Sequence, residues 1–321
     1  MAKLSIKKER SMKRHKVSII GAGAVGAIVA QNLAQRDAAD IVLLDVAEGI
    51  PQGKALDLLH ASPIYKFHGV IEGTNDYAST VDSNIVVITA GMPRKPGMSR
   101  KDLLSTNAKI MRDVVSESMK YSPEAVIMVV ANPVDVLTHI AYKKSGLPRN
   151  RVIGLSGTLD SIRLQSFIAQ AVGVSAEDVM AMVIGAHGKD NMLPLIRLAN
   201  VCGIPVKELL DEETLEKIEK RTREAGAEVV SLLKTRSAFY GPGAIVAEMI
   251  EAILKDRNKV FPAAVFLTGE YGINDCTLAV PVILGKNGIK RILEINLTEE
   301  EKNHLQAAAQ AVKEMLASIE L

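Results

Sequence analysis

The stretch VSIIGAGAVGAIVAQNL constrains the fold more than any other part of the sequence, because an apolar run that begins at Val17 leads directly into a glycine-rich turn. Gly21, Gly23 and Gly26 form a G-x-G-x-x-G pattern between an expected strand and an expected helix. Glycine permits the tight turn, lets a diphosphate approach the backbone, and lets the helix lie close to the sheet. This arrangement predicts a dinucleotide-binding turn.

Two neighbouring features support the same prediction. Ala24 and Val25 lie at the start of the expected helix, where backbone amides can face phosphate oxygens. The next apolar run, IVLL, ends in Asp45, about 20 residues after the turn. A carboxylate there would accept hydrogen bonds from a ribose 2′-hydroxyl and repel a 2′-phosphate, which favours NAD over NADP. The alternative is a tight turn beside a surface aspartate, with no ligand. It does not explain why a strand, a glycine turn, a helix and a second strand ending in Asp45 follow one another.

The first half of the chain alternates short apolar runs with stretches long enough for a helix. Strands this apolar are typical of a parallel sheet that is buried on both faces. We therefore expect an α/β fold that begins with a doubly wound, parallel-sheet (Rossmann) NAD-binding domain at residues 17–154. Its expected strands are at 17–20, 41–44, 85–91, 125–133 and 152–154.

The pattern changes near residue 155, which indicates a second, mixed α+β domain for substrate binding and catalysis at residues 155–321. Its last helix should begin at a capping box formed by Thr298 and Glu301. The other expected elements are helices at 161–173 and 212–234 and strands at 179–185 and 277–285.

Composition excludes several classes of protein. The chain has 321 residues, a formal net charge of +2 and no apolar run approaching the roughly 18 residues of a membrane span, so we expect a soluble protein with neither a membrane nor a nucleic-acid partner. Cys202 and Cys276 lack metal-ligand spacing and are expected to be small core residues. They indicate no metal and a reducing compartment, which favours the cytoplasm.

Residues 1–16 carry seven lysines or arginines and one glutamate but no apolar segment of a signal peptide. We expect a solvated basic arm. A phosphate-binding or targeting role for this arm is the alternative.

Three groups could do chemistry. His187 follows an apolar run and lies among small residues in GAHG, which leaves room for a substrate, although a structural role is equally compatible. Asp160 and Arg163 of LDSIR share one helix face, where they could orient an imidazole and bind a carboxylate, or simply form an ion pair. The cationic loop TAGMPRKPGMSRKDLL follows a central strand, where ligands of open α/β sheets bind, and indicates an anionic substrate.

With these motifs in order, together with GIPQGKALDL and NPVD, the sequence resembles the lactate/malate dehydrogenase superfamily from Val17 to the terminal helix. Within it, the chain is most similar to malate dehydrogenases of the lactate-dehydrogenase-like type. The resemblance implies reversible, NAD-dependent oxidation of malate to oxaloacetate in the tricarboxylic acid cycle. It also implies a homo-oligomer, with a tetramer favoured over a dimer.

The resemblance also assigns roles to residues. His187 would transfer the proton and Asp160 would orient it, while Arg163 would bind the carboxylate next to the reacting carbon and Arg100 would polarise the carbonyl group. Asn132 would contact substrate and cofactor. Val130 and Asn107 would lie near the nicotinamide.

Arg94 is the residue expected to set specificity. In the family, glutamine at this position resembles lactate dehydrogenases and arginine resembles malate dehydrogenases. A planar guanidinium can bind a second carboxylate through two hydrogen bonds, whereas pyruvate offers only a methyl group. The expected substrate is therefore a small dicarboxylate.

One departure from the family pattern lies beside His187. The chain reads HGKDNMLPL, with Lys189 where the family usually has an acid and with an apparent extra residue before Pro194. Two other functions stay open: a lactate or dual-specificity 2-hydroxyacid dehydrogenase, and a non-catalytic NAD-binding sensor.

Overall fold

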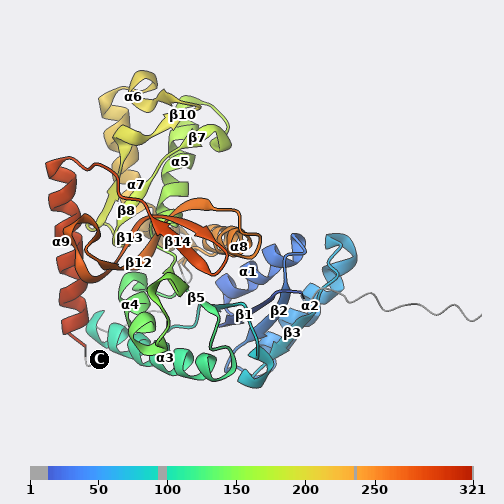
Figure 1. Cartoon of the computed structure of the whole chain (residues 1–321). Coiled ribbons are helices and arrows are strands. Elements are labelled where there is room, and N and C mark those ends of the chain that lie inside the picture. Colours follow the sequence, from blue (N-terminus) through green and yellow to red (C-terminus); the bar gives the residue numbers. More distant parts are fainter. Residues whose placement is uncertain (1–13, 93–99, 235–236, 320–321) are drawn as a thin grey trace, which may run out of the picture.

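A computed structural model describes residues 14–92, 100–234 and 237–319 (Figure 1). Within these ranges the main sheet has 11 strands, and its first half is parallel in the order β3-β2-β1-β4-β5-β6. This half is the Rossmann sheet that the sequence predicts. Its strands are β1 (Lys16–Ile20), β2 (Asp40–Leu44), β3 (Ile71–Thr74), β4 (Ile85–Ile88), β5 (Val126–Val129) and β6 (Val152–Gly154).

Helices cover both faces of this parallel half, since every residue of β4 and β5 is buried. Helix α1 contacts α2, and α3 contacts α4, on opposite sides of the sheet. These helices are α1 (Ala24–Gln35), α2 (Ile50–Tyr65), α3 (Arg100–Tyr121) and α4 (Val134–Ser145).

The predicted strands of this parallel half are confirmed in place, but two of them end earlier than expected. β4 stops at Ile88 because Thr89 N and Ala90 N both donate to Ile20 O and the chain leaves the ladder. β5 stops at Val129, before Pro133 leads into α4. β3 was not predicted, because it is a four-residue edge strand in which only Ile71 is buried.

The second half of the main sheet is antiparallel and joins the first half where Gly154 of β6 pairs with Ala264 of β12. Strands and helices are mixed in this part of the chain, as predicted. The domain boundary between residues 154 and 155 stays a prediction. Its strands are β8 (Val183–Gly185), β9 (Met192–Pro194), β12 (Lys259–Thr268), β13 (Asn274–Gly285) and β14 (Gly288–Ile292).

A separate three-stranded sheet lies at the top of Figure 1 and consists of β7 (Val179–Met180), β10 (Asn200–Val201) and β11 (Ile204–Pro205). The prediction of one strand over 179–185 is therefore wrong. The chain leaves β7 after the exposed Met180 and re-enters a sheet at the fully buried β8, so one apolar run serves two sheets.

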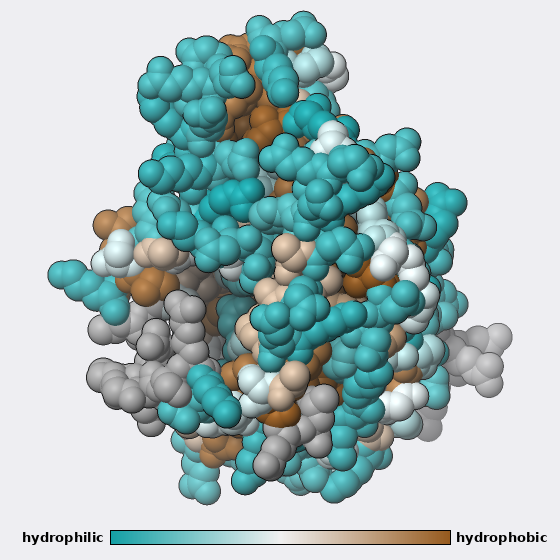
Figure 2. All heavy atoms as spheres, turned by 90° about the vertical axis from the view of Figure 1, so that its left-hand side faces the viewer, coloured by the Kyte–Doolittle hydropathy of each residue, from teal (hydrophilic) through white to brown (hydrophobic). Residues whose placement is uncertain are grey.

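The helices of the second half include the long helix and the terminal helix that the sequence predicts, and the capping box of Thr298 and Glu301 is present. Hydrophilic atoms cover most of the side on which α9 lies (Figure 2). The helices are α5 (Gly157–Val172), α6 (Val206–Leu209), α7 (Glu212–Leu233), α8 (Tyr240–Leu254) and α9 (Glu299–Ala317), with 3₁₀ turns η1 (Tyr77–Thr80), η2 (Arg149–Arg151), η3 (Ala176–Asp178), η4 (Ile196–Leu198) and η5 (Glu270–Gly272).

Two smaller expectations are corrected. Cys276 is buried, but Cys202 is exposed, because it lies in the turn between β10 and β11, where its φ is 47°. Lys16, assigned to the basic arm, is the first residue of β1, and Arg14 pairs with Asp37 at 2.7 Å. The rest of the arm, residues 1–13, lies outside the described residues.

Candidate active site

The glycine turn follows β1 and begins where Gly21 N donates to Leu44 O at 2.7 Å. Gly21 has a φ of 109°, and a Cβ atom there would lie 2.5 Å from Thr89 Oγ1. A Cβ on Gly26 would lie 2.0 Å from Gly21 O, so a side chain would push α1 away from the turn. Among the described residues, no atom lies within 4 Å of a Cβ on Gly23. The turn is closed on the protein side and accessible on the other.

The start of α1 is free to receive an anion. Gly23 is the N-cap of α1 and has no side chain that could accept a hydrogen bond. The first backbone amides of the helix, at Ala24 and Val25, are therefore not capped by a side chain of this residue. The Asp45 carboxylate lies beside the turn and accepts hydrogen bonds from Ala22 N at 2.7 Å and from Ala47 N at 3.0 Å. An open turn, an uncapped helix start and an acidic residue after β2 fit the diphosphate and ribose of NAD.

The carboxyl ends of β4 and β5 meet beside this turn. Asn107 of α3 is buried there and links the two ends, because its side chain accepts from Met92 N at 2.7 Å and donates to Asn132 O at 3.1 Å. Asn132 is exposed, and its side chain has no hydrogen bond within the described part of the chain. Val130 is half-buried at the end of β5. Contacts of these three residues with cofactor or substrate stay predictions.

The structure brings together His187, Asp160 and Arg163. His187 Nδ1 lies 2.8 Å from Asp160 Oδ2, and Arg163 Nη1 lies 3.0 Å from Asp160 Oδ1. The Asp160 side chain is only 1% exposed, whereas that of His187 is 23% exposed. Because Nδ1 is held by the carboxylate, Nε2 is the nitrogen left for a substrate. A buried carboxylate therefore orients both an accessible imidazole and a guanidinium.

The electrostatics of this group favour a charged imidazole. Burial disfavours the imidazolium ion, but the Asp160 carboxylate more than offsets this effect and raises the pKa of His187 above its ordinary value. Asp135 acts in the same direction, and Arg163 acts against it. His187 can therefore hold a proton at a higher pH than a free imidazole can.

Asp135 is a residue of this group that the sequence reasoning missed. It lies in the first turn of α4, is 3% exposed, and accepts hydrogen bonds from His187 N at 2.7 Å and Ser156 Oγ at 3.1 Å. Burial raises its pKa to about 6 despite these hydrogen bonds. Asp135 thus fixes the main chain of His187 while Asp160 fixes its ring. The NPVD motif contains Asp135, but nothing local in the sequence indicates this partner.

For two of the predicted substrate arginines, the structure does not describe the side chain. Arg94 lies outside the described residues, and Arg100 is the first residue of α3, although nothing is described of its side chain. The loop predicted to extend through Leu104 therefore gives way to helix at Arg100.

The departure from the family pattern forms a contact with α7. Lys189 pairs with Glu224 at 2.6 Å, and both side chains are substantially exposed. Arg223, which precedes Glu224 on α7, donates to Met192 O at 2.5 Å. Lys189 and Arg223 therefore both join the segment after His187 to α7.

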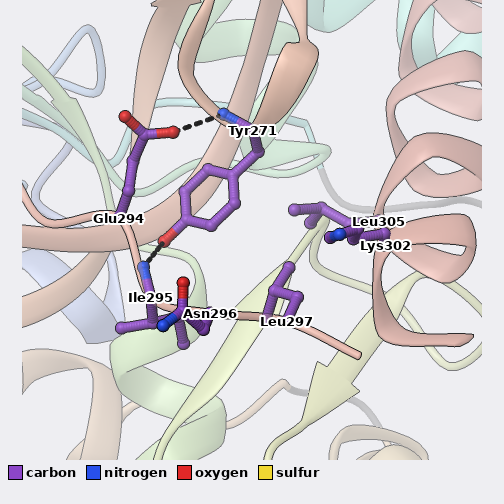
Figure 3. Close-up of a pocket in the computed structure, with 7 residues that line it drawn as sticks. All are labelled: Tyr271, Glu294, Ile295, Asn296, Leu297, Lys302 and Leu305. Carbon is purple, nitrogen blue, oxygen red and sulfur yellow. Dashed lines mark hydrogen bonds between the residues drawn. The ribbon is translucent and has the colours of Figure 1, made fainter. Parts of the chain in front are cut away.

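A hollow of about 240 Å³ lies away from this group, between Tyr271, Glu294 and α9 (Figure 3). Two hydrogen bonds cross its lining, since Tyr271 N donates to Glu294 Oε2 at 2.9 Å and Ile295 N donates to the Tyr271 hydroxyl at 3.1 Å. The described residues contain no cluster of His, Cys, Asp or Glu that could hold a metal ion. None of their helices is long and apolar enough to cross a membrane.

Models of known families match nearly the whole chain. The NAD-binding domain of lactate/malate dehydrogenase matches residues 15–154. The alpha/beta C-terminal domain of lactate/malate dehydrogenase matches residues 157–320.

Individual relatives agree with these matches. A malate dehydrogenase of Desulforudis audaxviator is 50% identical over 310 residues, which are 97% of this chain and all of that protein. The structure of apo malate dehydrogenase from Picrophilus torridus is 46% identical with a TM-score of 0.92, covering 95% of this chain and 97% of that one. A Cryptosporidium parvum lactate dehydrogenase complexed with lactic acid and NAD is 40% identical with a TM-score of 0.91, covering 96% and 98%.

Proposed function

Because the chain belongs to the lactate/malate dehydrogenase family, we propose that it catalyses the reversible, NAD-dependent oxidation of (S)-malate to oxaloacetate. The observation that carries this proposal is the contact of His187 with the buried Asp160, which also holds Arg163. A proton-transferring imidazole beside a carboxylate-binding guanidinium is what a 2-hydroxyacid dehydrogenase needs.

His187 moves the proton at Nε2. In oxidation, the neutral imidazole takes the proton of the substrate hydroxyl group, and in reduction it starts protonated and returns that proton to the carbonyl oxygen. The Asp160 carboxylate stabilises the imidazolium ion and keeps Nε2 directed at the substrate. Asp135 holds the backbone of His187 in place.

Three arginines would bind and polarise the substrate. Arg163 would hold the carboxylate beside the reacting carbon through two parallel hydrogen bonds. Arg100 would polarise the carbonyl group, and Arg94 would bind the second carboxylate. Asn132, whose side chain is exposed at the end of β5, would contact both substrate and cofactor.

The cofactor would be held by the glycine turn and by Asp45. Gly21 and Gly26 allow the tight turn and the close packing of α1, Gly23 would leave room for the diphosphate, and the amides at the start of α1 would face it. When bound, the nicotinamide ring supplies the hydride acceptor or donor.

The proposal is tested by initial rates with NADH and either oxaloacetate or pyruvate, followed by the loss of NADH absorbance. We expect kcat/KM for oxaloacetate to exceed that for pyruvate by at least about 100-fold, because pyruvate has no second carboxylate to pair with the Arg94 guanidinium. Equal or faster reduction of pyruvate would instead support a lactate or dual-specificity dehydrogenase. That result would agree with the similarity to the Cryptosporidium lactate dehydrogenase. NADH binding without turnover of either ketoacid would support a sensor.

We also propose that the protein is a homo-oligomer, and the resemblance favours a tetramer over a dimer. Helix α2 supports an interface, because Leu56, Leu59 and Ile64 are 53%, 47% and 82% exposed. Sedimentation equilibrium should give four times the mass of the chain, and Leu59→Lys should lower that mass. A monomeric unaltered protein would contradict this proposal.

The cellular setting follows from the same assignment. A malate dehydrogenase with two free cysteines suits the cytoplasm and the tricarboxylic acid cycle. We expect neither a membrane nor a nucleic-acid partner at a net charge of +2. Fractionation of cells and a DNA-binding titration at low salt would check these two expectations.

A further inference from the structure

Lys54 makes an unusual contact with the glycine turn. Its Nζ atom donates to Ala22 O at 2.5 Å and to Gly23 O at 3.2 Å, reaching across from the first turns of α2. The side chain is half-buried and forms no ion pair with any described carboxylate. Backbone carbonyl groups, and not a carboxylate, therefore hold the Lys54 ammonium group beside the turn.

This contact fixes the direction of two backbone amides. In a trans peptide the C=O and N–H groups point in opposite directions. Ala22 O shares its peptide with Gly23 N, and Gly23 O shares its peptide with Ala24 N. Because Lys54 holds both oxygens on the side of α2, both N–H groups point away from it. Neither amide has an acceptor within the described part of the chain.

Among the described residues, the other side chains that bond to the turn hold only the preceding peptide. Thr89 Oγ1 donates to Gly21 O at 2.8 Å, and the Asp45 carboxylate accepts from Ala22 N at 2.7 Å. In the next part of the turn, Gly23 O also accepts a hydrogen bond from Ala27 N at 3.1 Å, which is the first backbone hydrogen bond of helix α1. Lys54 is therefore the side chain that orders the part of the turn nearest to the helix start.

We propose that Lys54 is a positioning residue for the cofactor diphosphate. It turns the amides of Gly23 and Ala24 toward the phosphate oxygens, and its ammonium charge offsets their negative charge. The ribose and the adenine do not depend on it. The inference rests on the proposed function only in taking NAD as the ligand.

The test compares ligands with and without a diphosphate. For Lys54→Met, we expect the Kd values of NADH and ADP to rise at least about 10-fold, as for the loss of one charged hydrogen-bond donor. The Kd of adenosine, measured by competition with NADH fluorescence, should change less than about twofold. Lys66→Met removes a matched, exposed lysine just after the same helix and should leave all three values unchanged.

Further variants separate charge from hydrogen bonding and guard against misfolding. Lys54→Arg keeps the charge and the donors and should bind ADP within about threefold of the unaltered protein. Lys54→Gln keeps a donor without the charge and should fall between the arginine and methionine variants.

Two results would overturn the inference: ADP binding by Lys54→Met that matches the unaltered protein, or an equal loss for adenosine and ADP, which indicates a general structural role. These outcomes differ from a failure of the proposed function. An unaltered protein that binds NADH and ADP but reduces no ketoacid would refute the enzyme assignment and still allow the comparison of Lys54 variants.

Discussion

His187→Gln is expected to lower kcat by at least about 100-fold in both directions, while NADH binds with nearly unchanged affinity. The amide of glutamine can still contact the substrate oxygen, but it cannot take up or release a proton at neutral pH. Stopped-flow or steady-state rates with oxaloacetate and a fluorescence titration with NADH measure the two quantities. His15→Gln, at an exposed histidine, is the matched control.

Asp160→Asn should produce a loss of similar size for a different reason. Without the carboxylate, burial dominates and the pKa of His187 falls. Reduction requires protonated His187, so its rate falls as the pH rises through that pKa. The falling limb of kcat/KM against pH should therefore move to lower pH in Asp160→Asn.

The two substitutions should be far from additive. His187 and Asp160 act as one unit at 2.8 Å, so the double variant should be little slower than His187→Gln alone. Near-normal turnover of His187→Gln, or losses that simply multiply, would remove the pair from the role we assign to it.

The parts of the fold that the sequence predicts are those with a strong local pattern. β1, β4 and β5 are buried on both faces, so they read as continuous apolar runs. α9 begins at a capping box that the sequence contains in full. The glycine turn is equally local, because its closest approaches involve Gly21 and Gly26 themselves.

Not all missed parts lacked a local pattern, since β12 (KVFPAAVFLT) is an apolar run that was not predicted, but others depend on tertiary packing. α8 contains Gly241, Pro242 and Gly243, which are poor helix formers, and its helix forms because it is buried against α1. A Cβ on Gly243 would lie 2.3 Å from Ile28 Cγ2, so the glycine is required by the packing and not by a turn.

The same distinction applies to the site. The spacing of Asp160 and Arg163 on one helix face was readable from LDSIR, but their meeting with His187 depended on the family resemblance. The role of Asp135 depends on a hydrogen bond to an amide 52 residues further along the chain. No periodicity or local motif encodes such a contact.

Arg94→Gln is expected to have the largest effect on specificity. The preference for oxaloacetate over pyruvate, expressed as the ratio of the two kcat/KM values, should fall by a factor on the order of 10⁴. Arg94 would hold the second carboxylate of oxaloacetate with two hydrogen bonds, and that carboxylate would be left unpaired in the variant. With pyruvate, the unaltered enzyme would instead leave the guanidinium unpaired.

Variants at and beside Arg94 show whether the effect is local. Lys95→Gln removes the same charge one position along the chain and should leave the preference within about threefold, since general attraction of anions is screened by salt. Arg94 itself lies outside the described residues, but the chain that leads to it is anchored where Asn107 Oδ1 accepts from Met92 N at 2.7 Å.

Arg94→Lys separates charge from geometry. Lysine keeps the positive charge but lacks the planar fork, so the preference for oxaloacetate should be intermediate between those of the unaltered enzyme and Arg94→Gln. If pyruvate is reduced as well as oxaloacetate by the unaltered enzyme, or if Arg94→Gln keeps the preference, the second carboxylate must be bound elsewhere. The segment SAFYGPG, at residues 237–243, would then be the next place to substitute, because it leads into α8 beside Leu159 and Ile162 of the helix that carries Arg163.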